Sequence, residues 1–428
     1  MKRSWPLLIG VFLCAVASAQ WPTQAQETLT PALQKIAAAK KAIESAPDRP
    51  QSYNQLAIAF ERRAAETGDV SFYDHAEEAL RKSFSISAAN LEGQKIRASV
   101  LLGERRYQEA VEQATAVNKL WPDDVLVYGY IADAQMALGN YAAAEEAAQW
   151  MLNLRPGNIP GMRRAADLRE AFGDADGAAE MLSAELVQTA PTEVADRAYV
   201  MTRLGRLQLA AGHLNEAEKL LQQAHDLFPN LPYTLEVVAE LRRAQGRLAD
   251  AAQVLNQLYL MNPSAEQAYK LAVALEREGQ KNYTQSTYRE FERKAWQAID
   301  RSANANVELV FYYVDHAGKP QEALQIAKTE FSRRPNVYAR DAYAWALAAN
   351  GRLAEARKQV EAALEVGTRD PGLFYHAGVI ATQSRDPKSG AAYFNASLDV
   401  NALSEFAPAA RQALEKLASA STIASAGK

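Results

Sequence analysis

Prolines recur along this chain at nearly constant intervals, and this regularity constrains the fold more than any other feature. Successive members of the series are 34, 35, 38 and 34 residues apart, and the last follows after two further periods. The series is Pro122, Pro156, Pro191, Pro229, Pro263 and Pro335. A period of this length is typical of repeat architectures, in which each repeat must stack on its neighbours to bury its apolar face.

Glycines follow the same period, each between two Ala-rich amphipathic stretches. They are Gly139, Gly173, Gly212, Gly246, Gly279, Gly318 and Gly351. In the unit 125–156, Gly139 ends a first helix because Gly readily takes the left-handed conformation of a C-cap. Pro156 ends the second helix because proline lacks the backbone N–H. Small residues at Ala132 and Ala144 are expected where the two helices approach most closely.

This pattern resembles the tetratricopeptide repeat (TPR) family, whose repeats place an aromatic or large residue, Leu-Gly, Gly, Tyr, Ala, Phe or Tyr, Ala and Pro at set offsets. One copy reads Leu204-Gly205, Gly212, Leu214, Ala217, Leu221, Ala224 and Pro229. Another reads Leu235, Ala239, Gly246, Leu248, Ala251, Leu255 and Pro263. The resemblance covers most of the chain, and the recurrence in register is what makes it specific.

The resemblance implies an all-α fold, a right-handed superhelical α-solenoid of about ten TPR-like helix pairs with a closing C-terminal helix. The expected units lie at about 50–88, 91–122, 125–156, 159–191, 198–229, 232–263, 265–301, 304–335, 337–368 and 371–401. We expect the solenoid to span 32–418, with a leading helix from Ala32 to Ser45 and a closing helix from Pro408 to Ala418. An Ala/Ser-rich tail at 419–428 is expected to be disordered. Length alone would suggest two to three domains in 428 residues, but a repeat array makes them one body.

The start of the chain has the three-part layout of a secretory signal peptide. Basic residues precede an apolar run over 7–17, and small residues precede a cleavage site after Ala19. We therefore predict a signal peptide at 1–19 and a polar leader at 20–31. An uncleaved anchor is the first alternative, although the apolar run is short. A lipoprotein modified at Cys14 is the second, although lipid attachment favours a small residue before the cysteine.

Cleavage would make the mature protein periplasmic or secreted and would remove its single cysteine. No later segment has 18 consecutive apolar residues, so no membrane span is expected in the mature chain. The charges nearly balance, with 47 Lys+Arg against 51 Asp+Glu, and no clustered basic surface suggests nucleic acid. The five histidines are scattered, and phosphate-loop, zinc-protease and nucleophile-elbow motifs do not occur. We therefore expect no enzyme, no cofactor and no metal.

The resemblance implies that the first helices of the repeats line a concave groove that binds extended peptides or partner helices. Tyrosine recurs on the inferred inner face, with charged neighbours that could set the register of a partner. The candidate binding residues are Tyr199, Arg206, Tyr233, Glu240, Arg243, Tyr269, Tyr312, Tyr338 and Tyr375. The alternative is that these tyrosines pack between adjacent repeats, and helical spacing does not separate the two interpretations.

The favoured function is a non-enzymatic, exported TPR scaffold that captures a protein segment and supports an assembly or secretion complex in the envelope of a Gram-negative-type bacterium. The alternative is an accessory subunit that recruits a glycan or a catalyst in cell-wall or exopolysaccharide machinery. An enzyme without a recognisable motif is a third hypothesis, which a bound metal would revive. Charged residues on the closing helix are consistent with an end cap, so we expect a monomer.

Overall fold

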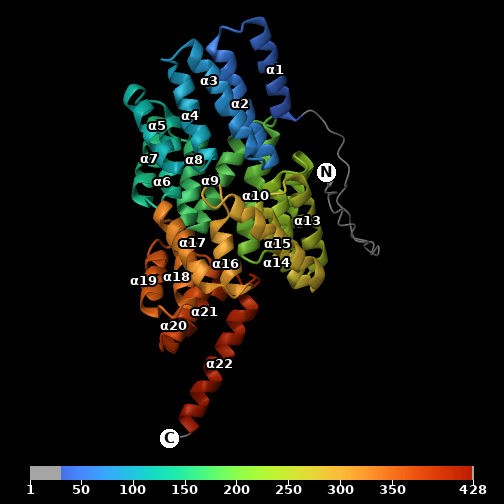
Figure 1. The fold of residues 1–428 in the computed structure, drawn as a ribbon, viewed down its shortest axis with the longest axis vertical. Coiled ribbons are helices and arrows are strands. Elements are labelled where there is room, and N and C mark those ends of the chain that lie inside the picture. Colours follow the sequence, from blue (N-terminus) through green and yellow to red (C-terminus); the bar gives the residue numbers. More distant parts are fainter. Residues whose placement is uncertain (1–29, 427–428) are drawn as a thin grey trace, which may run out of the picture.

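The computed structural model describes residues 30–426, which form helices joined by short turns (Figure 1). The first helices are α1 (Pro31–Ser45), α2 (Pro50–Thr67), α3 (Ser71–Ile86), α4 (Leu91–Gly103), α5 (Tyr107–Leu120), α6 (Val125–Ala137), α7 (Tyr141–Leu154), α8 (Ile159–Ala171), α9 (Ala175–Gln188), α10 (Val194–Ala210) and α11 (Leu214–Leu227). The others are α12 (Pro232–Ala244), α13 (Leu248–Met261), α14 (Ala265–Glu278), α15 (Lys281–Gln297), α16 (Asn306–Asp315), α17 (Pro320–Arg333), α18 (Val337–Ala349), α19 (Leu353–Leu364), α20 (Pro371–Gln383), α21 (Pro387–Val400) and α22 (Ala407–Ala426).

The helices form antiparallel pairs, so the predicted all-α solenoid is confirmed. Even-numbered helices from α2 to α20 are the first members of the pairs; each packs on its own second helix, and several also contact the next first helix. Side-chain caps fix several starts: Asp124 accepts from the first turn of α6, and Asn158 from that of α8. None of the described helices is long and apolar enough to cross a membrane.

The ends of the array differ partly from expectation. The leading helix lies where it was expected, as α1. The closing helix was expected to stop at Ala418 and to give way to a disordered tail at 419–428, but α22 continues to Ala426. The physical reason is that this segment is rich in alanine, which has the highest helix propensity. The predicted signal peptide and most of the predicted leader lie outside the described residues.

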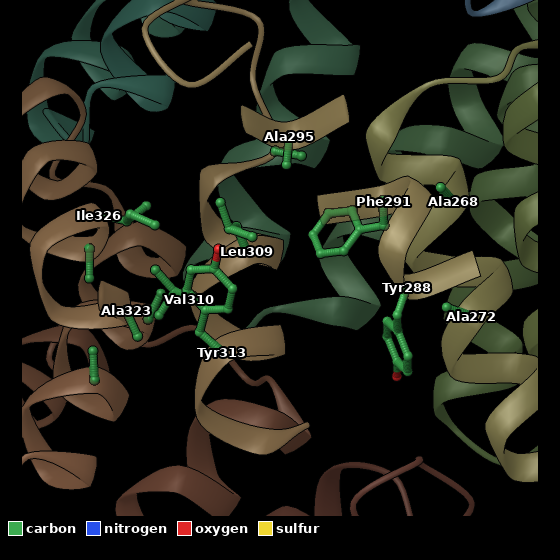
Figure 2. Close-up of a cluster of buried hydrophobic side chains, with 14 residues drawn as sticks. Ala268, Ala272, Tyr288, Phe291, Ala295, Leu309, Val310, Tyr313, Ala323 and Ile326 are labelled. Atoms are coloured by element: carbon green, nitrogen blue, oxygen red, sulfur yellow. The ribbon is translucent and has the colours of Figure 1, made fainter. Parts of the chain in front are cut away.

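The core runs along the array as a series of clusters, each shared by neighbouring helix pairs. The cluster in Figure 2 joins the helix pair α14–α15 to the next pair, α16–α17, with Phe291 from α15 and Tyr313 from α16 fully enclosed. Alanines such as Ala268 and Ala323 lie opposite these rings and allow the helices to approach closely. A repeat therefore depends on its neighbours for burial, as stacked repeats do.

Successive turns of the superhelix also contact one another, which nearest-neighbour stacking alone does not require. Hydrogen bonds join residues 194 to 199 positions apart, or roughly six repeat periods. They are Asn262 Nδ2 to Gly68 O at 2.5 Å, Arg105 Nη1 to Asn304 O at 3.3 Å, Asn336 Nδ2 to Ala137 O at 2.9 Å, Val337 N to Tyr141 Oη at 3.1 Å, and Thr368 Oγ1 to Ala171 O at 2.7 Å. The superhelix is therefore wound tightly enough for its successive turns to be in direct contact.

Two turn glycines are placed where these coils touch. A Cβ at Gly139 would lie 2.6 Å from the carbonyl oxygen of Pro335, and one at Gly173 would lie 2.5 Å from that of Gly367. Both glycines also have positive φ angles, +79° and +81°. By contrast, Gly212 has the same φ as Gly173 and open space around it. At Gly139 and Gly173, glycine meets two requirements, the left-handed turn and the contact between coils.

Candidate ligand-binding groove

The first helices of neighbouring repeats are joined by ion pairs. Arg164 of α8 pairs with Asp133 of α6 at 2.5 Å, and Lys270 of α14 pairs with Glu236 of α12 at 2.8 Å. Between them, Arg203 of α10 pairs with Asp167 and Glu170 of α8. Much of the charge on these helices is therefore neutralised within the protein. A partner would interact mainly with charged side chains that do not belong to these ion pairs.

A cavity of about 690 Å³ opens on the first helices α10, α12, α14 and α16. Its inner wall includes the predicted groove residues Arg206, Glu240, Arg243 and Tyr269. The opposite wall comes from the start of α20 and from the segment that joins α21 to α22. A cavity of this size lies in the range of ligand pockets. The superhelix thus brings together residues from both ends of its C-terminal half.

Most of the predicted tyrosines are half-buried against other rings rather than fully displayed. The ring-centroid distances are 5.4 Å for Tyr199–Tyr233, 5.1 Å for Tyr269–Phe291, 4.8 Å for Tyr288–Tyr312 and 5.5 Å for Tyr375–Phe406. Burial raises the pKa of Tyr199 to about 12. Each of these tyrosines therefore has a packing contact, and ligand binding by them stays a prediction.

Two of the predicted residues, both on first helices, are exposed. Tyr338 of α18 is 61% exposed, and Glu240 of α12 is also exposed. The surrounding protein nevertheless raises the pKa of both side chains by desolvation, to about 12 for Tyr338. The Tyr338 hydroxyl senses the charges of Asp370, Arg206 and Glu170, which come from three different repeats. Exposure to water combined with enclosure by protein is what a side chain inside a concave surface experiences.

The two predicted arginines have different surroundings. Arg206 pairs with Glu170 and donates from Nε to the Tyr233 hydroxyl at 2.9 Å, so its charge is satisfied. Arg243 forms no ion pair with any described residue and donates from Nη1 to the backbone oxygen of Leu403 at 2.8 Å. Desolvation lowers the pKa of Arg243. Of these two arginines, Arg243 is therefore the one whose charge is not neutralised by an ion pair among the described residues.

A histidine that sequence reasoning did not single out lies on the cavity wall. His376 of α20 is 3% exposed, and its Nδ1 lies 2.9 Å from an oxygen of Asp341. The indole of Trp345 stacks on the imidazole with 4.4 Å between ring centroids. Burial opposes the charged imidazolium, but the Asp341 carboxylate outweighs it and raises the pKa of His376. The hydrogen bond to Asp341 fixes the His376 ring on the cavity wall. His376 and Asp341 are 35 residues apart, about one repeat period, and this spacing was a sequence signal that could have identified the pair.

Partly buried acids on the first helices predict an unusual pH dependence of stability. Burial raises the pKa of Glu61 and of Glu308 to about 7, from a usual value of 4.5, and raises that of Asp167 to about 6. The folded state therefore binds more protons than the unfolded state between about pH 4.5 and 7, and the raised pKa of His376 acts in the same direction. We expect a higher urea midpoint at pH 5.5 than at pH 8.

The matched variants for this prediction are Glu61→Gln and, as a control on the exposed face of α7, Glu145→Gln. Glu61→Gln should flatten part of the pH dependence, because its amide does not titrate, whereas Glu145→Gln should leave the dependence unchanged. A urea midpoint that falls from pH 8 to pH 5.5, or an unaltered slope in Glu61→Gln, would contradict the assignment.

Within residues 30–426, no group of three or more His, Cys, Asp or Glu side chains is arranged to hold a metal ion. Sequence reasoning also missed the segment between α21 and α22, because nothing in the repeat pattern places it against α12 and α14. It missed Arg277 as well, which lies one repeat period after Arg243 and was open to detection from that register.

Comparisons with known proteins agree with this architecture. A family model described as the tetratricopeptide repeat matches residues 97–159, a stretch that contains most of α4 and the whole of α5, α6 and α7. No curated protein matches the chain in sequence.

Solved structures resemble the chain at low sequence identity. Human IFIT1 is 13% identical, with 88% of this chain and 92% of that chain covered and a TM-score of 0.48. PilW, a type IV pilus biogenesis factor, is 15% identical, with 48% and 93% covered and a TM-score of 0.40. A TPR protein of Thermus thermophilus is 17% identical, with 44% and 97% covered and a TM-score of 0.39. The family match over 97–159 and the helix pairs that repeat from α2 to α21 show that the chain contains tetratricopeptide repeats.

Proposed function

We propose that this protein is a non-enzymatic scaffold that binds an extended segment of a partner protein on the inner face of its superhelix. The observation that carries the proposal is the cavity of about 690 Å³ on α10 to α16, lined by both charged and aromatic side chains. Extended concave surfaces of this kind are what stacked helix pairs provide for recognition.

The character of the inner wall supports a peptide as the ligand. The cavity is lined both by apolar side chains such as Val273 and Phe311 and by charged ones such as Glu240 and Arg243. A peptide offers both apolar side chains and backbone hydrogen-bonding groups, so this mixture suits it. Charged residues on the wall would then set the register of the bound segment.

We also propose that the protein works in a bacterial envelope, after removal of residues 1–19. This part of the proposal rests on the sequence alone, through the basic start, the apolar run and the small residues before Gln20. Mass spectrometry of the exported chain should find Gln20 at the N-terminus. An N-terminus at Met1, or a lipid on Cys14, would instead support one of the alternatives.

The binding proposal is tested with a photo-crosslinking amino acid placed at one position at a time in cells. Tyr338 is the inner position, since it is 61% exposed on a first helix and its hydroxyl is influenced by the charges of Asp370, Arg206 and Glu170 from other repeats. Val187 of α9 is the matched outer position, because it is 85% exposed and on a second helix. We expect a discrete crosslinked protein band from position 338 and none from position 187. Equal crosslinking from both positions, or none from 338, would contradict binding on the inner face.

A further inference from the structure

The segment that joins α21 to α22, residues 401–406, lies across the cavity and is called the strap below. It has no regular secondary structure, unlike the helices on either side of it. Its residues Asn401, Ser404, Glu405 and Phe406 all line the cavity. The strap thus presents to the inner face of the solenoid what a bound peptide would present, a short non-helical stretch of chain.

Two arginines in equivalent positions hold the strap. Arg243 of α12 donates to the backbone oxygen of Leu403 at 2.8 Å. Arg277 of α14, one repeat period later, pairs with the carboxylate of Glu405. Neighbouring first helices therefore contact the strap two residues apart, one through the backbone and one through a side chain. Because the arginine of α12 contacts Leu403 and that of α14 contacts Glu405, the strap runs in the same direction as the order of the repeats.

The aromatic end of the strap is seated against α20. The Phe406 ring lies 5.5 Å from that of Tyr375 and 5.6 Å from that of His376, between ring centroids. A Cβ at Gly372 would come within 2.7 Å of the Phe406 ring, so the backbone of α20 approaches the ring closely. Phe406 thus has a seat formed by aromatic rings and bare backbone.

The strap is held incompletely, as a replaceable occupant would be. The hydroxyl of Ser404 is buried and has no hydrogen-bond partner among the described residues. The Arg277–Glu405 pair is partly open to water, with side-chain exposures of 35% and 41%, and exposed pairs contribute little stability. Arg243 donates to a neutral carbonyl oxygen, and the charges of Glu405 and Glu240 do not fully offset the desolvation that lowers its pKa. A peptide that offers the same groups therefore replaces the strap contacts with equivalent ones.

We propose that the strap is an internal ligand of the groove, and that the partner is an extended peptide of the same chemistry. Such a peptide places a backbone carbonyl on Arg243, a carboxylate side chain two residues later on Arg277, and an aromatic ring in the Phe406 seat. It binds by displacing the strap. This inference rests on the proposed function and adds to it the class of peptide and the side chains that select it.

The probe is a fluorescein-labelled peptide with the sequence of residues 400–408, titrated into the full chain by fluorescence anisotropy. In the wild-type chain the strap competes at the high effective concentration of a tethered segment, so binding should be weak. The strap variant Glu405→Gln/Phe406→Ala should bind the peptide at least ten-fold more tightly. The milder Glu405→Gln alone should gain about two- to five-fold, which keeps the test valid if the double variant does not fold by circular dichroism.

The arginines are tested in the strap variant. Arg277→Gln and Arg243→Gln should each weaken peptide binding about three- to ten-fold, because each removes a charge-assisted hydrogen bond. Arg293→Gln, an exposed arginine paired with Glu290 on α15, is the matched control and should change nothing. A peptide with its own Glu and Phe replaced by Gln and Ala should bind weakly.

An unchanged affinity in the strap variants, or equal affinity in the arginine variants, would overturn the inference. The two proposals fail separately. A partner that crosslinks at position 338 while the peptide ignores Arg243 and Arg277 would leave the scaffold proposal standing and remove the strap as its model ligand. Peptide binding that depends on Arg243 and Arg277, without a crosslinked partner at position 338, would support the strap as a ligand of the groove and contradict the scaffold proposal.

Discussion

Gly139→Ala should lower the free energy of unfolding by about 3 kcal/mol, more than an ordinary turn-glycine substitution. An L-residue at φ +79° is strained by about 1–2 kcal/mol. The new Cβ would also lie 2.6 Å from the carbonyl oxygen of Pro335, a backbone atom that cannot rotate away. The two superhelical coils must therefore separate locally, which weakens the neighbouring bond from Asn336 to Ala137.

Gly212→Ala is the matched control, because Gly212 has a φ of +81° and nothing within 4 Å of the added Cβ. Its cost should be the conformational strain alone, about 1–2 kcal/mol. Urea denaturation measures both variants, and small-angle scattering should show a larger radius of gyration only for Gly139→Ala. Equal losses at the two glycines would mean that the coils do not touch in solution.

Glu330→Ala should be still more damaging, at about 3–5 kcal/mol, because it leaves buried partners of a carboxylate unpaired. Glu330 is 1% exposed on α17 and pairs with Arg334. It also accepts from the side-chain amides of Asn304, at 3.3 Å, and Asn306, at 2.9 Å. These groups fix the linker between α15 and α16, which contains no proline.

The control for this variant is Glu322→Ala on the same helix, since Glu322 is exposed and its removal should cost about 0.5 kcal/mol or less. Loss of the Glu330 network should also release the contact between Arg105 and the backbone of Asn304. Hydrogen exchange should then rise over 298–306 without a comparable change in α2 and α3. If Glu330→Ala and Glu322→Ala had similar urea midpoints, the network would have no structural importance.

Local features of the fold were accessible from the sequence because they depend on short-range patterns. The unit expected at 125–156 is found as α6 and α7, with the turn at Gly139. Ala132 and Ala144 are both buried at the close approach of these two helices. Periodicity predicts these features because each helix packs on the other helix of its pair and on the adjacent repeat, all within about one period of the sequence.

Features that depend on the pitch of the superhelix were not accessible in this way. The spacing placed Tyr233 and Tyr338 on equivalent faces, yet the first is half-buried beside Arg206 and the second is 61% exposed. Which tyrosine finds a neighbour depends on the distance between helices, and periodicity alone does not determine it. For the same reason the strap, whose contacts lie 128 and 160 residues away, gave no sequence signal.

The contacts between coils also bear on how the chain reaches its native state. A simple array has only local contacts, so folding can start at any repeat and spread along it. Among the residues that the structure describes, five hydrogen bonds link positions almost 200 residues apart. Closing such long loops costs chain entropy before any contact repays it, and a high contact order slows folding. Assembly should therefore have two stages, a fast zipping of helix pairs and a slower winding of one coil onto the next.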